Sequence, residues 1–181
     1  MPRRPTPKEG QCAHITLRAQ NREFLLSPHL YWDDLSAWIN CLPCFFDIRL
    51  HHFIIMSNHF HFILTPGHIP LGDAMKYFTS NMAKFLNFKQ GRINHIFGNR
   101  YSPTVIHDTR HLINVIRYLY QNPLRAGIVK RVEAYKFSSL GFYQSTSNTG
   151  IRLSYDPFSA GMFEQGASGW MKWNDHVANP V

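Results

Sequence analysis

Two histidines one residue apart, His59 and His61, are the feature of the sequence best suited to chemistry. On a β-strand, residues i and i+2 project to the same face, so both imidazoles would lie together while Phe60 and Phe62 point into apolar packing. Two neutral imidazoles can bind one first-row divalent metal ion, although a tight site needs a third ligand from elsewhere in the chain. A pair of strand histidines that binds no metal is the alternative interpretation.

A second pair of chemically capable side chains is Tyr118 and Asn122, four residues apart. On a helix this spacing places them about 40° from each other, on one flank of the apolar stripe. The Asn122 amide oxygen is a hard metal ligand, and the Tyr118 phenol one turn away can act as a nucleophile. From the helix alone, however, ordinary packing of the tyrosine and a helix end at Asn122-Pro123 are the stronger expectation.

Hydrophobic periodicity indicates which elements hold these residues. In chain order we predict a strand at 13–17, a helix that starts near 27–33 and ends at Pro43, two strands within 44–64 around a bend at 56–58, a helix at 71–89, a short strand at 104–106 and a helix at 111–121 that ends at Asn122-Pro123. This order, β-α-β-β-α-β-α, is close to the split βαβ arrangement. The sequence therefore predicts an α+β, ferredoxin-like fold with an antiparallel sheet and helices packed on one face.

Composition and charge are typical of a basic globular protein. The 181 residues include 19 Lys and Arg against 11 Asp and Glu, which gives a formal net charge of +8, and 44% of them are hydrophobic. That much apolar surface excludes a disordered basic tail, and the charge favours polyanionic partners. We expect a basic arm at 1–11, one globular domain at 12–143 and a partly irregular C-terminal appendage at 144–181.

The sequence also indicates where the protein works. No stretch approaches the roughly 20 uninterrupted apolar residues that cross a bilayer, and the Pro-rich start has no apolar run of a secretory signal behind it. Cys41 and Cys44 form a C-x-x-C pair with no second pair to complete a zinc site, so we expect reduced, structural thiols. These features favour a cytoplasmic protein with no membrane partner.

Several segments resemble one family, the single-tyrosine HUH transposases, and within it the REP-associated branch. The resembling segments, in chain order, are 13–22, 55–64, 91–101, 118–129 and 135–139. Residues 55–64, IMSNHFHFIL, are similar to the H-x-H segment of the family, and residues 118–129, YLYQNPLRAGIV, to the tyrosine helix of that branch. The resemblance covers about residues 12–143 in the right order, and N-P-x-R-A-G is its most specific motif.

The resemblance implies a metal-dependent DNA transposase. By residue match, His59, His61 and Asn122 would bind Mg²⁺ or Mn²⁺, and Tyr118 would be the nucleophile that cuts single-stranded DNA. The cut would leave a 5′-phosphotyrosine and a free 3′-hydroxyl, and the stored bond would later pass to another DNA end. Expected partners are single-stranded or hairpin DNA at repeat or transposon ends and, in a homodimer, a second copy of the chain. The protein would be nucleoid-associated when bound to DNA.

Two positions depart from the family pattern. Tyr120 places a second phenol close to the first, but it points about 200° away around the helix, which favours Tyr118 as the nucleophile. Ser57-Asn58 stands where a Pro-Asn pair is more usual, which changes the entry into the strand and leaves the two histidines in place.

Basic residues are the candidates for binding DNA in the expected transposase. In turns and at element ends a guanidinium can reach phosphates in a fork geometry, and the arginines so placed are Arg18, Arg22, Arg92, Arg100 and Arg125. The matching family segments carry basic residues at Arg18 and Arg100, so we expect these two first. Phe97 and Tyr101 lie near them and are candidates to stack on unpaired bases.

Two other functions use the same residues. A non-catalytic module on this fold would bind structured DNA, and its affinity would survive the loss of His59 or Tyr118. A metal-dependent phosphoesterase with water as its nucleophile would hydrolyse small phosphodiesters without Tyr118. The transposase alone predicts a covalent link between protein and DNA.

Overall fold

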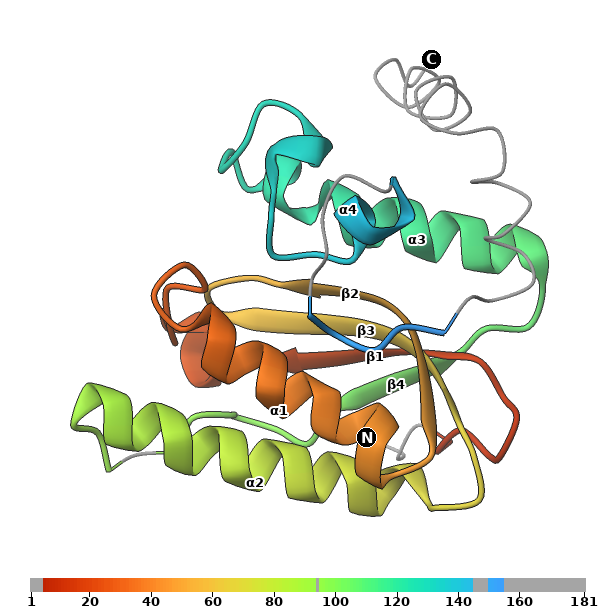
Figure 1. Ribbon diagram of the computed structural model, residues 1–181, viewed down its shortest axis with the longest axis horizontal. Helices are drawn as coiled ribbons and strands as arrows, with labels where there is room; N and C mark the ends of the chain where they lie inside the picture. The colour runs from red at the N-terminus through yellow and green to blue at the C-terminus, as the bar shows by residue number, and fades with distance from the viewer. Residues whose placement is uncertain (1–4, 94, 145–149, 155–181) are drawn as a thin grey trace.

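The computed structural model describes residues 5–93, 95–144 and 150–154 (Figure 1). In these ranges four strands form one antiparallel sheet in the order β2-β3-β1-β4: β1 Ala13–Arg18, β2 Ile48–Ile55, β3 His59–Pro66 and β4 Ser102–Val105. The helices are α1 Trp32–Phe45, α2 Leu71–Gln90, α3 Thr109–Arg125 and α4 Leu140–Tyr143, with 3₁₀ turns η1 Gln20–Arg22 and η2 Val132–Ala134. The α+β class and the antiparallel sheet predicted from the sequence are confirmed.

Helices lie on both faces of the sheet, and not on one face alone. α1 and α2 pack on the face that includes Phe60 and Phe62, as predicted, whereas α3 lies across the opposite face (Figure 1). On that second face Ile54 and Ile63 form a separate apolar cluster with the stripe of α3. An apolar face of a sheet must be covered by another element. Ile63 points to the same face of β3 as His61, so this face also needs a helix.

Both prolines that were predicted to end helices lie inside them. α1 continues past Pro43, and α3 continues past Pro123. In the last turn of a helix a proline removes only one backbone hydrogen bond. In α3, Pro123 has no N–H that could donate to the Leu119 carbonyl. This carbonyl instead accepts a hydrogen bond from Asn122 Nδ2 at 3.2 Å.

The hairpin of β2 and β3 sets the position of the two histidines. The chain reverses direction at the predicted bend, 56–58, where the backbone N–H of Met56 donates to the His59 carbonyl at 2.9 Å. β3 pairs with β1 so that Arg18 lies opposite His59 and Thr16 lies opposite His61. Because β3 is an inner strand of the sheet, His61 lies between Thr16 on β1 and Ile54 on β2.

Tyr120 anchors α3 to the sheet. Its side chain is 2% exposed, and its hydroxyl lies 2.8 Å from His52 Nδ1 on β2 and 2.9 Å from the Ser139 hydroxyl. Buried hydroxyls with two partners fix the group that carries them. This phenol therefore sets the rotation of α3, and with it the direction of Tyr118 and Asn122.

Replacing Tyr120 with phenylalanine is expected to lower the free energy of unfolding by about 1–2 kcal/mol, because two buried partners lose a hydrogen bond. Urea unfolding measures the change. Tyr77→Phe, at a tyrosine that is 41% exposed, is the matched control and is expected to leave the free energy unchanged. Equal stability of the Tyr120→Phe variant and the wild type would show that Tyr120 does not anchor the helix.

The arm and the appendage predicted at the two ends are described only in part. The Gly10 amide donates to the Pro66 carbonyl at 2.9 Å, which holds the arm against the end of β3. Residues 150–154 lie beside β2, where the Ser154 amide donates to the Leu50 carbonyl at 2.8 Å and Ile151 joins the core. The rest of the predicted appendage, 145–149 and 155–181, lies outside the described residues.

Two further expectations concern cysteines and membranes. Cys12, Cys41 and Cys44 form no disulfide bond with one another. Among the helices that the structure describes, none combines the length and the apolar character needed to cross a bilayer.

Candidate active site

His59 and His61 from β3 meet Tyr118 and Asn122 from α3 on the face of the sheet that α3 covers. The ring centroids of the two histidines are 5.0 Å apart, and the His61 ring lies 5.7 Å from the Tyr118 ring. His59 Nε2 is 3.4 Å from Asn122 Oδ1. We call these four residues the histidine–tyrosine cluster. All four belong to one chain, so the cluster assembles without a second subunit.

Two acceptor atoms face each other at His59. Its Nδ1 lies 2.6 Å from Asn58 Oδ1, an oxygen whose orientation is set because Asn58 Nδ2 donates to the Arg22 carbonyl. Asn122 is oriented in the same way, since its Nδ2 donates to the Tyr118 carbonyl at 2.8 Å. Neutral imidazole has one N–H, and the shorter contact, to Asn58, takes it. His59 Nε2 and the Asn122 oxygen then turn lone pairs toward each other, an arrangement that a cation between them would satisfy.

The partners of His61 leave one ring nitrogen open. Its Nδ1 lies 2.9 Å from His14 Nε2 and 3.1 Å from the Thr16 hydroxyl, both on β1. Its Nε2 is buried and has no hydrogen-bond partner among the residues described. In the tautomer that carries its proton on Nδ1, that proton is donated to β1 and Nε2 keeps a lone pair for a metal ion.

Burial favours the neutral form of these imidazoles. Desolvation lowers the pKa of His61 well below its usual value, and the nearby His14, His59 and Arg18 act in the same direction. The pKa of His59 is lowered chiefly by desolvation, against a smaller opposing effect of its contact with Asn122. Burial, with a smaller effect of His111, lowers the pKa of His14 to about 4. Neutral imidazole is the form that binds metal ions.

These pKa values predict how the stability of the metal-free protein depends on pH. A histidine with a pKa of 6.5 in the unfolded chain and about 4 in the fold stabilises the fold fully above pH 6.5. As the pH falls from 6.5 towards 4, the unfolded chain takes up the proton first, and for His14 the loss reaches about 3 kcal/mol. Urea unfolding in EDTA across this range measures it. The variant His14→Gln is expected to lose less stability over the same interval; an identical pH profile would refute the assignment.

Tyr118 is the accessible phenol of α3. Its side chain is 38% exposed, and the Arg125 guanidinium lies 5.5 Å from the centre of its ring. Tyr120, the rival phenol considered in the sequence, is instead buried on His52 and Ser139. The structure thus brings Tyr118, and not Tyr120, to the two histidines.

A metal ion in this place would need an uncommon third protein ligand. Among the described residues no three His, Cys, Asp or Glu side chains gather into a metal site. The Asn122 amide oxygen would complete a set of two imidazoles and one hard oxygen, which suits Mn²⁺ and, less closely, Mg²⁺. Metal–ligand bonds of about 2.1 Å put adjacent octahedral ligands about 3 Å apart. The 3.4 Å between His59 Nε2 and Asn122 Oδ1 is near that separation.

The five arginines predicted to bind DNA lie in more than one place. Arg18 is the β1 residue opposite His59, and Arg125 covers the Tyr118 ring, so both lie at the histidine–tyrosine cluster. The other three lie elsewhere: Arg92 and Arg100 line a cavity beside α2, and Arg22 is in η1.

The two aromatic residues expected to stack on bases differ in their availability. Tyr101 is 7% exposed and belongs to the core, so little of its ring is available to a base, although it also lines the cavity beside α2. Phe97 is half-buried against the core, and its ring centroid lies 6.2 Å from that of Phe60. Its position on the wall of the cavity keeps part of the ring available.

Sequence reasoning missed His14 and Thr16. Both alternate with the buried residues of β1, which places them on the same sheet face as the histidines of β3. The alternation was visible in the sequence, but the register between β1 and β3 was not, and only the register places these side chains beside His61.

Comparisons with known proteins support the fold. No protein-family model matches the chain, and a search of curated proteins finds no match. Among solved structures, the chain is similar to the REP-associated tyrosine transposase bound to a REP hairpin, with a TM-score of 0.67 and 20% sequence identity. The match covers 88% of this chain and 96% of that one. At this level of identity, the likeness shows a common fold.

Proposed function

We propose that the chain is a transposase-like enzyme that cuts single-stranded DNA and transfers the strand, with Tyr118 as nucleophile and Mg²⁺ or Mn²⁺ as cofactor. The convergence of an accessible phenol, two neutral imidazoles and an oriented amide oxygen carries the proposal. The fold shared with a REP-associated tyrosine transposase supports it. So does the net charge of +8, which favours binding to a polyanion.

The histidine–tyrosine cluster has atoms suited to a divalent ion. His59 Nε2, His61 Nε2 and Asn122 Oδ1 would hold it. Two observations support this fit: His61 Nε2 has no hydrogen-bond partner among the described residues, and lone pairs face each other at His59. The bound ion would polarise the scissile phosphate and stabilise the charge that builds on it. His14 and Thr16 would keep His61 in the tautomer that leaves Nε2 available.

Tyr118 would carry out the covalent step. Its phenolic oxygen attacks the phosphorus of the DNA backbone, the new bond forms a 5′-phosphotyrosine, and the bond to the 3′-oxygen breaks. The phenol loses its proton to solvent and the 3′-oxygen gains one, so the step balances. Because the covalent link conserves the phosphodiester bond energy, transfer to another DNA end needs no nucleotide cofactor. Arg18 and Arg125 would neutralise the flanking phosphates.

We propose hairpin-bearing DNA as the substrate, by analogy with the structural neighbour, which was solved bound to a REP hairpin. The test is to incubate the protein with oligonucleotides that carry a hairpin and a single-stranded extension, in Mn²⁺, Mg²⁺ or EDTA. We expect a complex that survives denaturing electrophoresis with either metal and is absent in EDTA.

Two other outcomes would replace the proposal with a different function. Tight hairpin binding without an adduct under either metal would identify a DNA-binding module. Hydrolysis of small phosphodiesters that does not depend on Tyr118 would identify a phosphoesterase with water as its nucleophile.

A further inference from the structure

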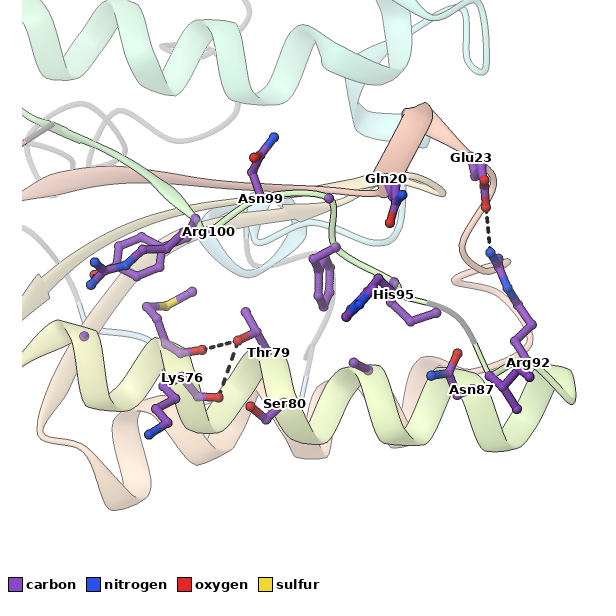
Figure 2. Close-up of a pocket in the computed structure, with 18 of the residues that line it drawn as sticks. Gln20, Glu23, Lys76, Thr79, Ser80, Asn87, Arg92, His95, Asn99 and Arg100 are labelled. Carbon is purple, nitrogen blue, oxygen red and sulfur yellow. Dashed lines mark hydrogen bonds and ion pairs between the residues drawn. The ribbon is translucent and has the colours of Figure 1, made fainter. Parts of the chain in front are cut away.

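Arg125 lies against the side chain that is proposed as the nucleophile. Its guanidinium is 5.5 Å from the centre of the Tyr118 ring, whereas Arg92 and Arg100 lie at the cavity beside α2 (Figure 2). A cation within about 6 Å of a ring centre is attracted to the face of that ring. Arg125 therefore acts on Tyr118 itself, in the protein without DNA.

A buried amide holds this guanidinium in place. Arg125 Nη2 donates to Gln121 Oε1 at 3.0 Å, and the Gln121 side chain is 6% exposed. Residues four apart are neighbours on a helix, and a buried side chain packed on all sides has few rotamers open to it. Gln121 Oε1 is thus a fixed acceptor above the helix surface. The guanidinium keeps further N–H groups that can bind a phosphate at the same time.

The end of α3 keeps Arg125 in register with Gln121 and Tyr118. Arg125 is the last residue of the helix, and Gly127 follows it with a φ of +68°. The Ile128 amide donates to the Pro123 carbonyl at 2.9 Å, and the Gly127 amide to the next carbonyl at 3.0 Å. This pair of bonds around a left-handed glycine closes the last helical turn. The glycine of the N-P-x-R-A-G motif therefore fixes the turn that carries its arginine.

The other contacts of the Tyr118 ring come from two histidines. The His61 ring lies 5.7 Å away at 86° and the His14 ring 6.3 Å away at 71°, both edge-to-face contacts. The side chain is nevertheless 38% exposed, so it has room to turn toward solvent. A nucleophile reacts from a position in which the reacting atoms are about 3–3.5 Å apart and in line. Turning toward solvent would take the phenol out of such a position.

We propose that Gln121 and Arg125 form a clamp that holds the Tyr118 ring in the orientation from which it attacks DNA. We call these two residues the tyrosine clamp. Arg125 is a positioning residue in addition to its contact with phosphate, and Gln121 acts through Arg125. This inference rests on the proposed function and deepens it: the clamp sets the rate of the covalent step and leaves the affinities for DNA and metal unchanged.

The single-turnover rate of adduct formation, at saturating hairpin DNA and Mn²⁺, tests the clamp. Gln121→Met removes the acceptor and keeps a side chain of similar length, so we expect the rate to fall about tenfold or more. The affinities for DNA, by fluorescence anisotropy, and for Mn²⁺, by calorimetry, should match those of the wild type. Gln121→Glu keeps an acceptor oxygen and should keep the rate. A rate in Gln121→Met equal to that of the wild type overturns the clamp, as does an equal loss of rate in Gln121→Glu.

Arg110→Gln is the control for the loss of a charge on the same helix. Arg110 is exposed in the first turn of α3, about two turns before Tyr118, so its replacement should keep the rate at saturating DNA. A loss in Arg110→Gln as large as that in Gln121→Met would show that the rate follows the charge of α3, which contradicts the clamp.

NMR spectroscopy of the protein without DNA detects the clamp independently of activity. Nuclear Overhauser contacts between the Arg125 side chain and the Tyr118 ring, identified by their loss in Tyr118→Phe, should be present in the wild type and in Gln121→Glu and lost in Gln121→Met. Contacts that persist in Gln121→Met, or are absent from the wild type, overturn the clamp.

The two experiments separate this inference from the proposed function. Wild-type adducts together with an unchanged rate in Gln121→Met refute the clamp and leave the strand transferase intact. An absence of wild-type adducts with either metal refutes the strand transferase, and the NMR contacts alone then decide whether Gln121 and Arg125 hold the Tyr118 ring.

Discussion

Tyr118→Phe is expected to abolish the covalent protein–DNA adduct, with a loss on the order of 10³-fold or more, because no other group of the cluster can form the phosphodiester link. Phenylalanine keeps the ring that packs beside His61 and under Arg125, so the fold and the affinity for hairpin DNA should stay near those of the wild type. Denaturing electrophoresis with labelled DNA measures the adduct, and a thermal melt checks the fold.

The control for this experiment is the second phenol of the same helix. Tyr120→Phe removes a hydroxyl that is bonded to His52 and Ser139, so it should reduce stability and still form adducts below its melting temperature. An adduct of equal yield in Tyr118→Phe would show that another residue is the nucleophile. Adducts lost in Tyr120→Phe and kept in Tyr118→Phe would reverse the assignment of the two tyrosines.

His61→Ala is expected to weaken the binding of Mn²⁺ on the order of 100-fold or more and to remove adduct formation with it. The variant loses one of the two imidazoles proposed as ligands, the one whose Nε2 is buried without a partner in the described chain. Isothermal titration calorimetry with Mn²⁺ alone measures the affinity without any DNA.

Two further variants make this result specific to the metal. His68→Ala removes an exposed histidine that pairs with Asp47 on the surface, so its Mn²⁺ affinity should match that of the wild type. Asn122→Asp keeps an oxygen ligand and adds a charge, so it should retain Mn²⁺ binding. Unchanged Mn²⁺ affinity in His61→Ala would exclude this histidine as a ligand, whatever the effect on DNA cleavage.

The sequence was informative wherever local pattern decides structure. Alternation in residues 59–62 correctly separated the histidines from Phe60 and Phe62, and the order of strands and helices predicted the topology of the sheet. The spacing of Tyr118 and Asn122 correctly placed both on one side of a helix that faces the histidines.

Features that depend on tertiary contacts were not predictable in the same way. Pro123 was expected to end α3, but the helix continues to Arg125. The Asn122 side chain donates a hydrogen bond to the Leu119 carbonyl, which receives none from the proline. The placement of α3 on the second sheet face depends on Ile63 and its cluster. The contribution of His14 depends on strand register, which alternation alone does not determine.

The fold is compatible with large differences in sequence. The similarity to the REP-associated tyrosine transposase extends over most of both chains at 20% identity. Since a fold hosts many functions, the proposed activity depends on the geometry of a few side chains and has to be tested at those side chains.

The location of a bound Mn²⁺ ion tests the central claim most directly. Anomalous diffraction at the manganese edge, from crystals of the full chain grown with Mn²⁺, would locate the ion independently of any activity. We expect one strong peak within bonding distance of His59 Nε2, His61 Nε2 and Asn122 Oδ1. A peak elsewhere, or no peak at these three atoms at saturating Mn²⁺, would contradict the account.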